Sequence, residues 1–291
     1  MNVDVATTAV DQTVRRAAVL GSPIKHSLSP VLHGAAYRAL DLHGWQYDKI
    51  ECDEPGLPRL VDGMGPEWVG LSLTMPLKRV ALAVADEVSP LAQAIGAANT
   101  LVFPAAGPAG GRQAHNTDVA GMVSALREAG LTRIEQAIIL GAGGTAQSAL
   151  AAVRELGNQS PIVLVRNLAR TGELRETAER LGMRPTISDG LITEPLPAAD
   201  LVISTLPGGA ADPLSANRWK PDTMVLDVVY APWPTPFAGS ALAAGCPVVS
   251  GLTVLLHQAV AQVTAAAREA ADPDLAAGRR PSALEPVSAA S

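Results

Sequence analysis

The sequence predicts an α/β fold with a mostly parallel sheet, and two observations lead to this prediction. Apolar runs of strand length alternate with segments whose apolar residues recur at helical spacing. One strand-to-helix junction, within residues 137–150, is also dense in glycine. The chain has 291 residues, enough for one large or two ordinary domains, and 48% of them are hydrophobic, so a sizeable core can be buried.

Composition excludes several classes of function. A net charge of −6 offers no basic surface for nucleic acid, and no apolar run approaches the length that spans a membrane. Residues 1–14 lack the apolar core of a signal peptide, so we expect a cytoplasmic protein. Neither the two distant cysteines, Cys52 and Cys246, nor the five histidines have the spacing of metal ligands, so we expect no metal site. Hydrolase motifs of the G-x-S-x-G or H-E-x-x-H type do not occur.

Strands are expected at residues 17–21, 47–52 and 68–74, with a helix over 31–42. Ser29-Pro30 has the form of an N-cap followed by proline at N1, which explains Ser29 without a function. In an extended segment, however, Ser27 and Ser29 share a face, and two hydroxyls beside a helix N-terminus can hold a carboxylate. The sequence leaves both interpretations open.

The strand over 68–74 runs into Lys78, and Pro76 suits the first turn of a helix that continues through Val84. Lys78 therefore lies near a strand's carboxyl end, where open α/β sheets bind ligands, although most lysines are simply exposed. Asp118 precedes a helix over 119–129 and is explained equally well as its N-cap. As a pair, the two side chains can position and relay a proton, and a structural salt bridge is the alternative.

The glycine-dense junction is preceded by a domain boundary at 126–131 and combines an apolar strand, a turn and a helix. Gly141, Gly143 and Ala146 fit G-x-G-x-x-G/A: the first residue makes a tight turn, the second admits a pyrophosphate, and the third allows close packing. Phosphates would lie over free N–H groups at the helix N-terminus. A turn that binds nothing is the alternative, but the order of the elements favours a Rossmann-type dinucleotide-binding domain.

The next strand, 161–165, indicates which dinucleotide would bind. NAD-binding units usually place Asp or Glu at its end, whereas this chain has no acidic residue before Glu173. Arg166 and Arg170 suit the 2′-phosphate of NADP, since guanidinium groups bind phosphate in bidentate geometry. Two exposed arginines can also be an ordinary solvated face, but the missing acid favours NADP.

Buried strands are expected at 200–207, 224–230 and 247–250, followed by a long helix from Gly251. At this point six motifs, spread in order over residues 18–267, resemble the shikimate dehydrogenase family. They are Gly21–Pro30, Thr74–Lys78, Ala98–Leu101, Asn116–Asp118, Asp227–Pro236 and Gly251–Gln258.

The resemblance implies a role for each matching residue. Lys78 becomes the acid–base residue, Asp118 its partner, and Ser27 and Ser29 the ligands of the shikimate carboxylate. Further substrate contacts fall to Thr74, Asn99, Tyr230 and Gln258. The implied cofactor-binding residues are Gly141, Ala142, Gly143, Gly144, Thr145, Ala146, Arg166, Asn167, Arg170, Val228 and Gly251.

The implied activity is the NADP-dependent, reversible reduction of 3-dehydroshikimate to shikimate, a step toward chorismate and the aromatic amino acids. The implied architecture is an N-terminal α/β substrate domain (15–118), a Rossmann-type NADP-binding domain (119–250) and a C-terminal helix (251–271) that returns to the first domain. Residues 1–14 and 272–291 are expected to be disordered. We expect a small-molecule substrate, no nucleic-acid or membrane partner, and a monomer or homodimer.

The chain departs from the family pattern at three places. Ser72 stands where the family usually has Asn, Val165-Arg166-Asn167 replaces Asn-Arg-Thr, and Val254 replaces a methionine. Three rival functions remain to be weighed: a quinate or aminoshikimate dehydrogenase using NAD, a non-catalytic NADP sensor, and a methylenetetrahydrofolate dehydrogenase. The presence of Lys78 and Asp118 disfavours the sensor, and the Ser27/Ser29 motif disfavours the folate enzyme.

Overall fold

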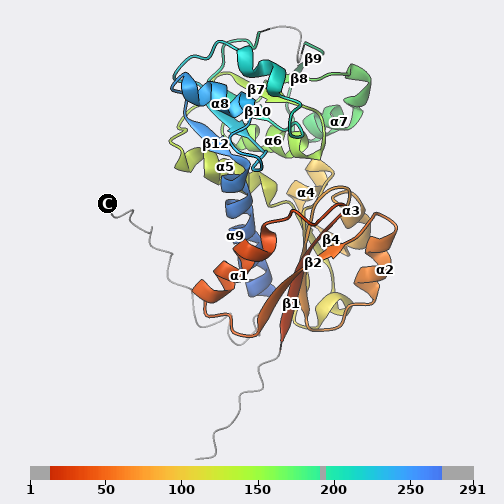
Figure 1. Cartoon of the computed structure of the whole chain (residues 1–291). Coiled ribbons are helices and arrows are strands. Elements are labelled where there is room, and N and C mark those ends of the chain that lie inside the picture. The colour runs from red at the N-terminus through yellow and green to blue at the C-terminus, as the bar shows by residue number, and fades with distance from the viewer. Residues whose placement is uncertain (1–13, 191–194, 271–291) are drawn as a thin grey trace, which may run out of the picture.

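A computed structural model describes residues 14–190 and 195–270 and divides them between two sheets joined by a long helix (Figure 1). Within these ranges, no helix combines the length and hydrophobicity that a bilayer span requires. The disorder expected for 1–13 and 272–291, and the predicted helix end at residue 271, lie outside the described residues.

The first sheet has the strand order β2-β1-β3-β5-β6-β4. Its strands are β1 (Arg15–Gly21), β2 (Trp45–Glu51), β3 (Trp68–Leu73), β4 (Glu87–Val88), β5 (Thr100–Val102) and β6 (Gln113–His115). The accompanying helices are α1 (Ser29–Ala39), α2 (Gly56–Asp62), α3 (Val80–Val84) and α4 (Pro90–Ile95).

This sheet is mostly parallel, as the sequence predicted, with one antiparallel strand, β5. Strand β1 pairs in parallel with β2 and β3, but β5 runs antiparallel to both β3 and β6. The connection from β5 to β6 contains only a 3₁₀ turn at Gly107–Gly110. A parallel pair needs a longer crossover, so this short Gly/Pro-rich connection dictates an antiparallel hairpin.

The second sheet is parallel throughout its described strands, with the order β12-β11-β10-β7-β8-β9. Its strands are β7 (Ala137–Leu140), β8 (Ile162–Leu164), β9 (Thr186–Ser188), β10 (Leu201–Ser204), β11 (Met224–Asp227) and β12 (Val248–Ser250). Its helices are α5 (Asp118–Glu128), α6 (Gly144–Glu155), α7 (Gly172–Arg180) and α8 (Pro236–Ala243). This order confirms the predicted Rossmann-type fold, in which ligands bind at the carboxyl ends of strands where the order reverses, here between β7 and β10.

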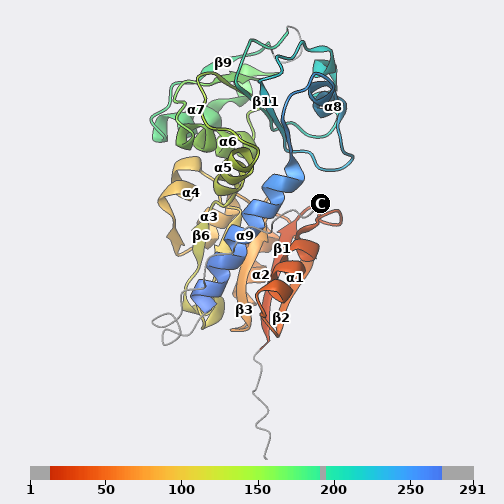
Figure 2. The same ribbon diagram turned by 90° about the vertical axis from the view of Figure 1, so that its left-hand side faces the viewer.

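Helix α9 (Gly251–Ala270) connects the two sheets. It leaves β12, packs along α5, and continues against α1, β3 and β5 of the first sheet (Figure 2). The predicted return of the C-terminal helix is therefore confirmed. Gly121 permits the close crossing with α5, because a Cβ there would lie 2.9 Å from the carbonyl oxygen of Val254.

One local prediction was wrong, and two alternatives that the sequence left open do not hold. The helix expected from Pro76 begins only at Val80, and residues 75–79 form turns. The reason is that the Lys78 carbonyl accepts a hydrogen bond from the Ala98 N–H (2.7 Å) instead of continuing a helical ladder. Ser29 and Asp118 are also not N-caps: each is the first residue of its helix, and the cap positions belong to Leu28 and Thr117.

Candidate active site

A cavity of about 300 Å³ is lined by residues from both halves of the molecule. Its walls include every residue that the sequence analysis assigned to catalysis or substrate: Ser27, Ser29, Thr74, Lys78, Asn99, Asp118, Tyr230 and Gln258. Of the predicted cofactor residues, Thr145, Val228 and Gly251 also line it. The volume suits a small molecule.

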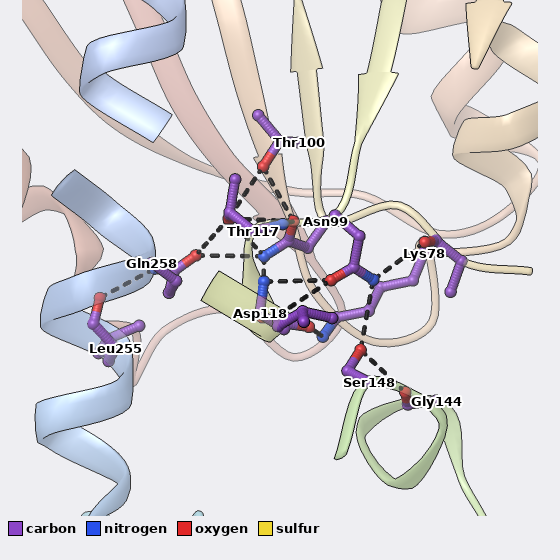
Figure 3. A network of polar contacts seen from close by, with 12 residues as sticks. Lys78, Asn99, Thr100, Thr117, Asp118, Gly144, Ser148, Leu255 and Gln258 are labelled. Carbon is purple, nitrogen blue, oxygen red and sulfur yellow. Dashed lines mark hydrogen bonds and ion pairs between the residues drawn. The ribbon is translucent and has the colours of Figure 1, made fainter. Parts of the chain in front are cut away.

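Lys78 and Asp118 form an ion pair inside this cavity (Figure 3), with 2.5 Å between Nζ and Oδ2. Lys78 lies in the turn after β3, and Asp118 opens α5, where the helix dipole favours a carboxylate. Their side chains are 21% and 14% exposed. Both groups therefore remain accessible to a ligand while being shielded from bulk water.

The Asn99 carboxamide holds the second oxygen of Asp118. Its Nδ2 donates to Asp118 Oδ1 (2.8 Å), to Thr117 Oγ1 (2.9 Å) and to Gln258 Oε1 (3.2 Å). Its Oδ1 accepts from the Thr117 N–H (2.7 Å) and from the Thr100 hydroxyl (2.9 Å). Figure 3 shows this arrangement, in which the amide of Asn99 can point only one way.

Gln258 brings α9 into the site. Its Nε2 donates to the Leu255 carbonyl of the same helix (3.0 Å), which leaves Oε1 facing Asn99 and Thr117. The long helix thus reaches the ion pair through two hydrogen-bonded amides, Gln258 and Asn99.

Ser27 lies in the turn between β1 and α1, Ser29 is the first residue of α1, and both line the cavity. Ser27 Oγ accepts a long hydrogen bond from the Ser29 N–H (3.3 Å), and the Ser29 side chain is buried. Lys49 donates to the backbone carbonyls of Lys25 (3.0 Å) and Ser27 (3.5 Å) of this turn. The sequence analysis missed Lys49, because nothing in the pattern of β2 distinguishes it from an exposed lysine.

The glycine turn between β7 and α6 has the space that a dinucleotide needs. Gly141 has φ +112°, and a Cβ there would lie 2.6 Å from Thr205 Oγ1, so only glycine fits. In contrast, a Cβ on Gly143 or Gly144 would meet no atom within 4 Å. No side chain caps the N-terminus of α6, so its first N–H groups are free to bind phosphate.

The remaining predicted cofactor residues lie on either side of this turn. Arg166, Asn167 and Arg170 follow β8 and are exposed, outside the cavity lining, and Asn167 Oδ1 accepts from the Ala169 N–H (2.9 Å). Gly251 begins α9, where a Cβ would collide with the carbonyl oxygen of Val228. The backbones of these last two residues are therefore in direct contact at the wall of the cavity.

The loop that carries Val228 and Tyr230 is held by a buried carboxyl group. Asp227 Oδ2 accepts from the Thr235 hydroxyl (2.7 Å), and Oδ1 accepts from the Val229 N–H (3.2 Å). Burial raises the pKa of the Asp227 carboxyl above its usual value. This side chain therefore fixes the loop rather than facing the cavity.

Sequence reasoning gave no role to three further polar residues: Ser72 and Gln262, which line the cavity, and Tyr47. The Tyr47 hydroxyl donates to Ser72 Oγ (2.6 Å), and the Ser72 hydroxyl donates to Gln262 Oε1 (2.8 Å). Gln262 lies four residues after Gln258 and so one turn further along the same face of α9, which is a signal that could have identified it. Tyr47 and Ser72 carried no such signal, because strand residues meet partners that only tertiary packing supplies.

Comparisons with known proteins agree with this geometry. Residues 19–101 match the family model described as the shikimate dehydrogenase substrate binding domain. The shikimate dehydrogenase (NADP(+)) of Desulfitobacterium hafniense is 36% identical over 252 residues, covering 85% of this chain and 90% of that protein.

Solved structures show the same likeness. A shikimate 5-dehydrogenase from Mycobacterium fortuitum is 44% identical, with a TM-score of 0.73, covering 87% of this chain and 92% of its own. A shikimate 5-dehydrogenase from Thermus thermophilus, solved in complex with NADP(H) and shikimate, is 32% identical, with a TM-score of 0.73. The match covers 86% of this chain and 92% of that protein's chain.

Proposed function

This chain belongs to the shikimate dehydrogenase family, and from that premise we propose how its residues carry out the NADP-dependent, reversible reduction of 3-dehydroshikimate to shikimate. The observation that carries the proposal is the Lys78–Asp118 ion pair, which faces a polar cavity lined by both halves of the chain. The reaction belongs to the biosynthesis of chorismate and the aromatic amino acids.

NADP is the cofactor, and when bound it supplies a hydride from nicotinamide C4 to the substrate's carbonyl carbon. The free N–H groups and open space of the turn 141–146 support pyrophosphate binding there. Arg166 and Arg170 bind the 2′-phosphate, with Asn167 between them. Val228 and Gly251 would hold the nicotinamide, since both line the cavity.

Lys78 handles the proton. As an ammonium group it donates a proton to the carbonyl oxygen while the hydride arrives at the carbon, and in the reverse direction it accepts that proton from the hydroxyl. Asp118 holds the ammonium group in place and compensates its charge. A structural salt bridge is a poorer explanation, because both side chains line the cavity rather than pack against apolar residues.

The substrate spans the cavity from the serine pair to the ion pair. Ser27 and Ser29 bind its carboxylate beside the N-terminus of α1. Asn99 and Gln258 bind ring hydroxyls near Asp118. Thr74 and Tyr230 line the remaining walls.

The domain limits follow from the same proposal. Residues 15–118, completed by 251–271, form the substrate domain, and residues 119–250 form the nucleotide domain. Closure of the two about the cavity would exclude water from the hydride transfer. A cytoplasmic location and a monomeric or homodimeric state remain predictions, and light scattering of the purified chain tests the latter.

The deciding experiment is steady-state oxidation of shikimate and of quinate, each with NADP and with NAD, followed at 340 nm. We expect shikimate with NADP to have by far the highest kcat/KM. A preference for quinate or NAD would contradict the assigned specificity while leaving the proton chemistry intact. Binding of NADP without any turnover would instead favour the sensor.

A further inference from the structure

We propose that Gln262, held by Ser72 and Tyr47, is a positioning residue that orients the Asn99 carboxamide toward Asp118 and the substrate. This inference rests on the proposed function and adds to it residues that contact neither Lys78 nor Asp118 directly. It concerns the row Tyr47–Ser72–Gln262–Thr100–Asn99, which we name the polar row; Ser72, Gln262 and Asn99 of this row line the cavity.

The polar row is continuous from the first sheet to the ion pair. Tyr47 on β2 donates to Ser72 on β3 (2.6 Å), and Ser72 donates to Gln262 on α9 (2.8 Å). Gln262 Nε2 then donates to Thr100 Oγ1 (3.1 Å), and the Thr100 hydroxyl donates to Asn99 Oδ1 (2.9 Å). Ser72, Asn99, Thr100 and Gln262 are buried, and Tyr47 is half-buried.

The hydrogen bonds of the polar row all point in one direction. Asp118 can only accept, so the Asn99 NH₂ group must face it and Asn99 Oδ1 must face Thr100. A hydroxyl has a single hydrogen, so Thr100 can donate to Asn99 only while it accepts from the Gln262 NH₂ group. Gln262 keeps that orientation because its other end accepts from Ser72. Aligned bonds of this kind polarise and strengthen one another.

At the β2 end of the polar row, stacking holds the Tyr47 ring in place. The ring stacks on His33 with 3.8 Å between the ring centroids. Burial raises the pKa of Tyr47, so the phenol stays a proton donor. The polar row therefore begins at a stacked aromatic ring on β2 and ends at the Asn99 amide that faces Asp118.

The departure of Ser72 from the family's usual asparagine fits this arrangement. The Tyr47 hydroxyl approaches Ser72 Oγ to 2.6 Å, which leaves no space for a longer side chain in that direction. A serine with Tyr47 beside it supplies the donor that Gln262 requires. A purely structural role would not require every donor to point toward Asp118.

The test measures shikimate oxidation by the purified full chain carrying Gln262→Met, which keeps the length of the side chain and removes its hydrogen bonds. We expect kcat to fall about tenfold or more, as small displacements near reacting groups do, with KM for NADP unchanged within about twofold. In an Asn99→Ala background the same substitution should change kcat less than about twofold, because the group it orients is gone.

Further variants separate positioning from folding. Tyr47→Phe keeps the stacked ring but removes its hydroxyl, and Ser72→Ala removes the serine hydroxyl. Both variants should therefore lower kcat, as Gln262→Met does. Ser72→Thr keeps a hydroxyl and should have a kcat close to that of the unmodified chain. Thr264→Val is the matched control on α9, since the exposed Thr264 hydroxyl bonds only within its own helix (2.8 Å to the Val260 carbonyl). If Gln262→Met does not fold, Tyr47→Phe and Ser72→Ala decide the question.

Two results would overturn the inference alone: a folded Gln262→Met enzyme with kcat within about twofold of the unmodified chain, or full additivity of Gln262→Met with Asn99→Ala. An unmodified chain that binds NADP but does not oxidise shikimate would overturn the proposed function and this inference with it. The activity of the unmodified chain therefore distinguishes the two failures.

Discussion

Lys78 and Asp118 illustrate how much depends on single residues in the cavity. Each side chain is partly buried, and Asp118 receives hydrogen bonds on both oxygens, from Lys78 and from Asn99. Removing the ammonium group would leave the carboxylate correctly placed but without the group that carries the proton. A single substitution in this pair can therefore abolish activity without disturbing the fold.

We expect Lys78→Ala to lower kcat for shikimate by about 10²- to 10⁴-fold, the usual contribution of a positioned acid–base group. The affinity for NADP should be nearly unchanged, because the glycine turn lies in the other half of the molecule. Steady-state kinetics and a calorimetric titration with NADP measure the two effects. The exposed Lys220→Ala serves as the control, and unchanged turnover in Lys78→Ala would rule out the assignment.

His33 predicts how stability depends on pH. Its ring is 2% exposed and its Nδ1 bonds to the Ser29 carbonyl at 2.9 Å. Burial lowers the pKa of His33 from 6.5 to about 4. The unfolded chain therefore binds more protons between these values, so the contribution of His33 to stability is present above pH 6.5 and is lost as the pH falls toward 4.

We expect the unfolding free energy of a His33→Phe variant to decline less between pH 6.5 and pH 4 than that of the unmodified chain. Phenylalanine keeps an aromatic ring against Tyr47 but cannot take up a proton. Urea unfolding at several pH values across this range measures the difference. Parallel pH profiles for the two proteins would contradict the assignment of a neutral, buried His33.

At the scale of elements, substitutions in the glycine turn can separate an effect on the unfolding free energy from an effect on NADP binding. A Cβ on Gly143 would stand in open space at an ordinary φ of −79°, so Gly143→Ala should change the unfolding free energy by less than about 1 kcal/mol. The same methyl group would obstruct the approach of pyrophosphate. KM for NADP should therefore rise about tenfold, equivalent to ~1.4 kcal/mol.

Gly141→Ala is the matched comparison, since its Cβ would meet Thr205 and its φ of +112° is strained for alanine. This variant should lose stability as well as NADP affinity. Thermal unfolding and NADP titration of both variants are the measurements. Equal stability losses at the two positions would show that Gly143, like Gly141, is there for packing.

The elements differ in how far the sequence predicts them. Strands such as β7 and β11 and the long α9 follow from uninterrupted apolar runs or helical spacing, and the local order strand–glycine–helix predicts the Rossmann-type half. Two-residue β4 and three-residue β9 are too short to have a period. The helix expected at Pro76 does not form there, because the Lys78 carbonyl accepts a hydrogen bond from the N–H of Ala98, a residue distant in the sequence.

The candidate site divides in the same way. Lys78, Asn99 and Asp118 can be named from motifs and from their places after strands, and the structure brings them together within hydrogen-bonding distance, although their roles remain predictions. Tyr47 could not be named, and Ser72 could be named only as a departure from the family pattern, without a role. Their importance arises only when α9 places Gln262 against the first sheet, and no local pattern encodes that contact.

At the scale of the whole molecule, the two halves meet on a second side, away from α9. The last carbonyls of the short helix α4 have no partner in their own helix and are satisfied by side chains of α7. Thr177 Oγ1 donates to the Ile95 carbonyl (2.8 Å), and Arg180 Nε donates to the Ala94 carbonyl (2.8 Å). An ion pair between Arg79, in the turn before α3, and Glu173 of α7 also joins the two halves.

This contact bears on the cavity, because α4 leads within four residues to Asn99. Thr177 is fully buried, so Thr177→Val keeps its shape but leaves the Ile95 carbonyl without a donor. We expect the unfolding free energy to fall by about 1–3 kcal/mol. The loosened end of α4 should also displace Asn99, raising KM for shikimate while the affinity for NADP changes little.

Thermal unfolding, KM for shikimate and an NADP titration together decide what the α4–α7 contact does. Thr264→Val is again the control, since it removes an exposed hydroxyl that bonds within its own helix. Lower stability with an unchanged KM would mean that α7 merely caps α4. A rise in KM confined to shikimate would mean that the nucleotide half helps to set the substrate site at a distance. In that case the two sheets act as one unit, joined on one side by α9 and on the other by three side chains of the α7 region.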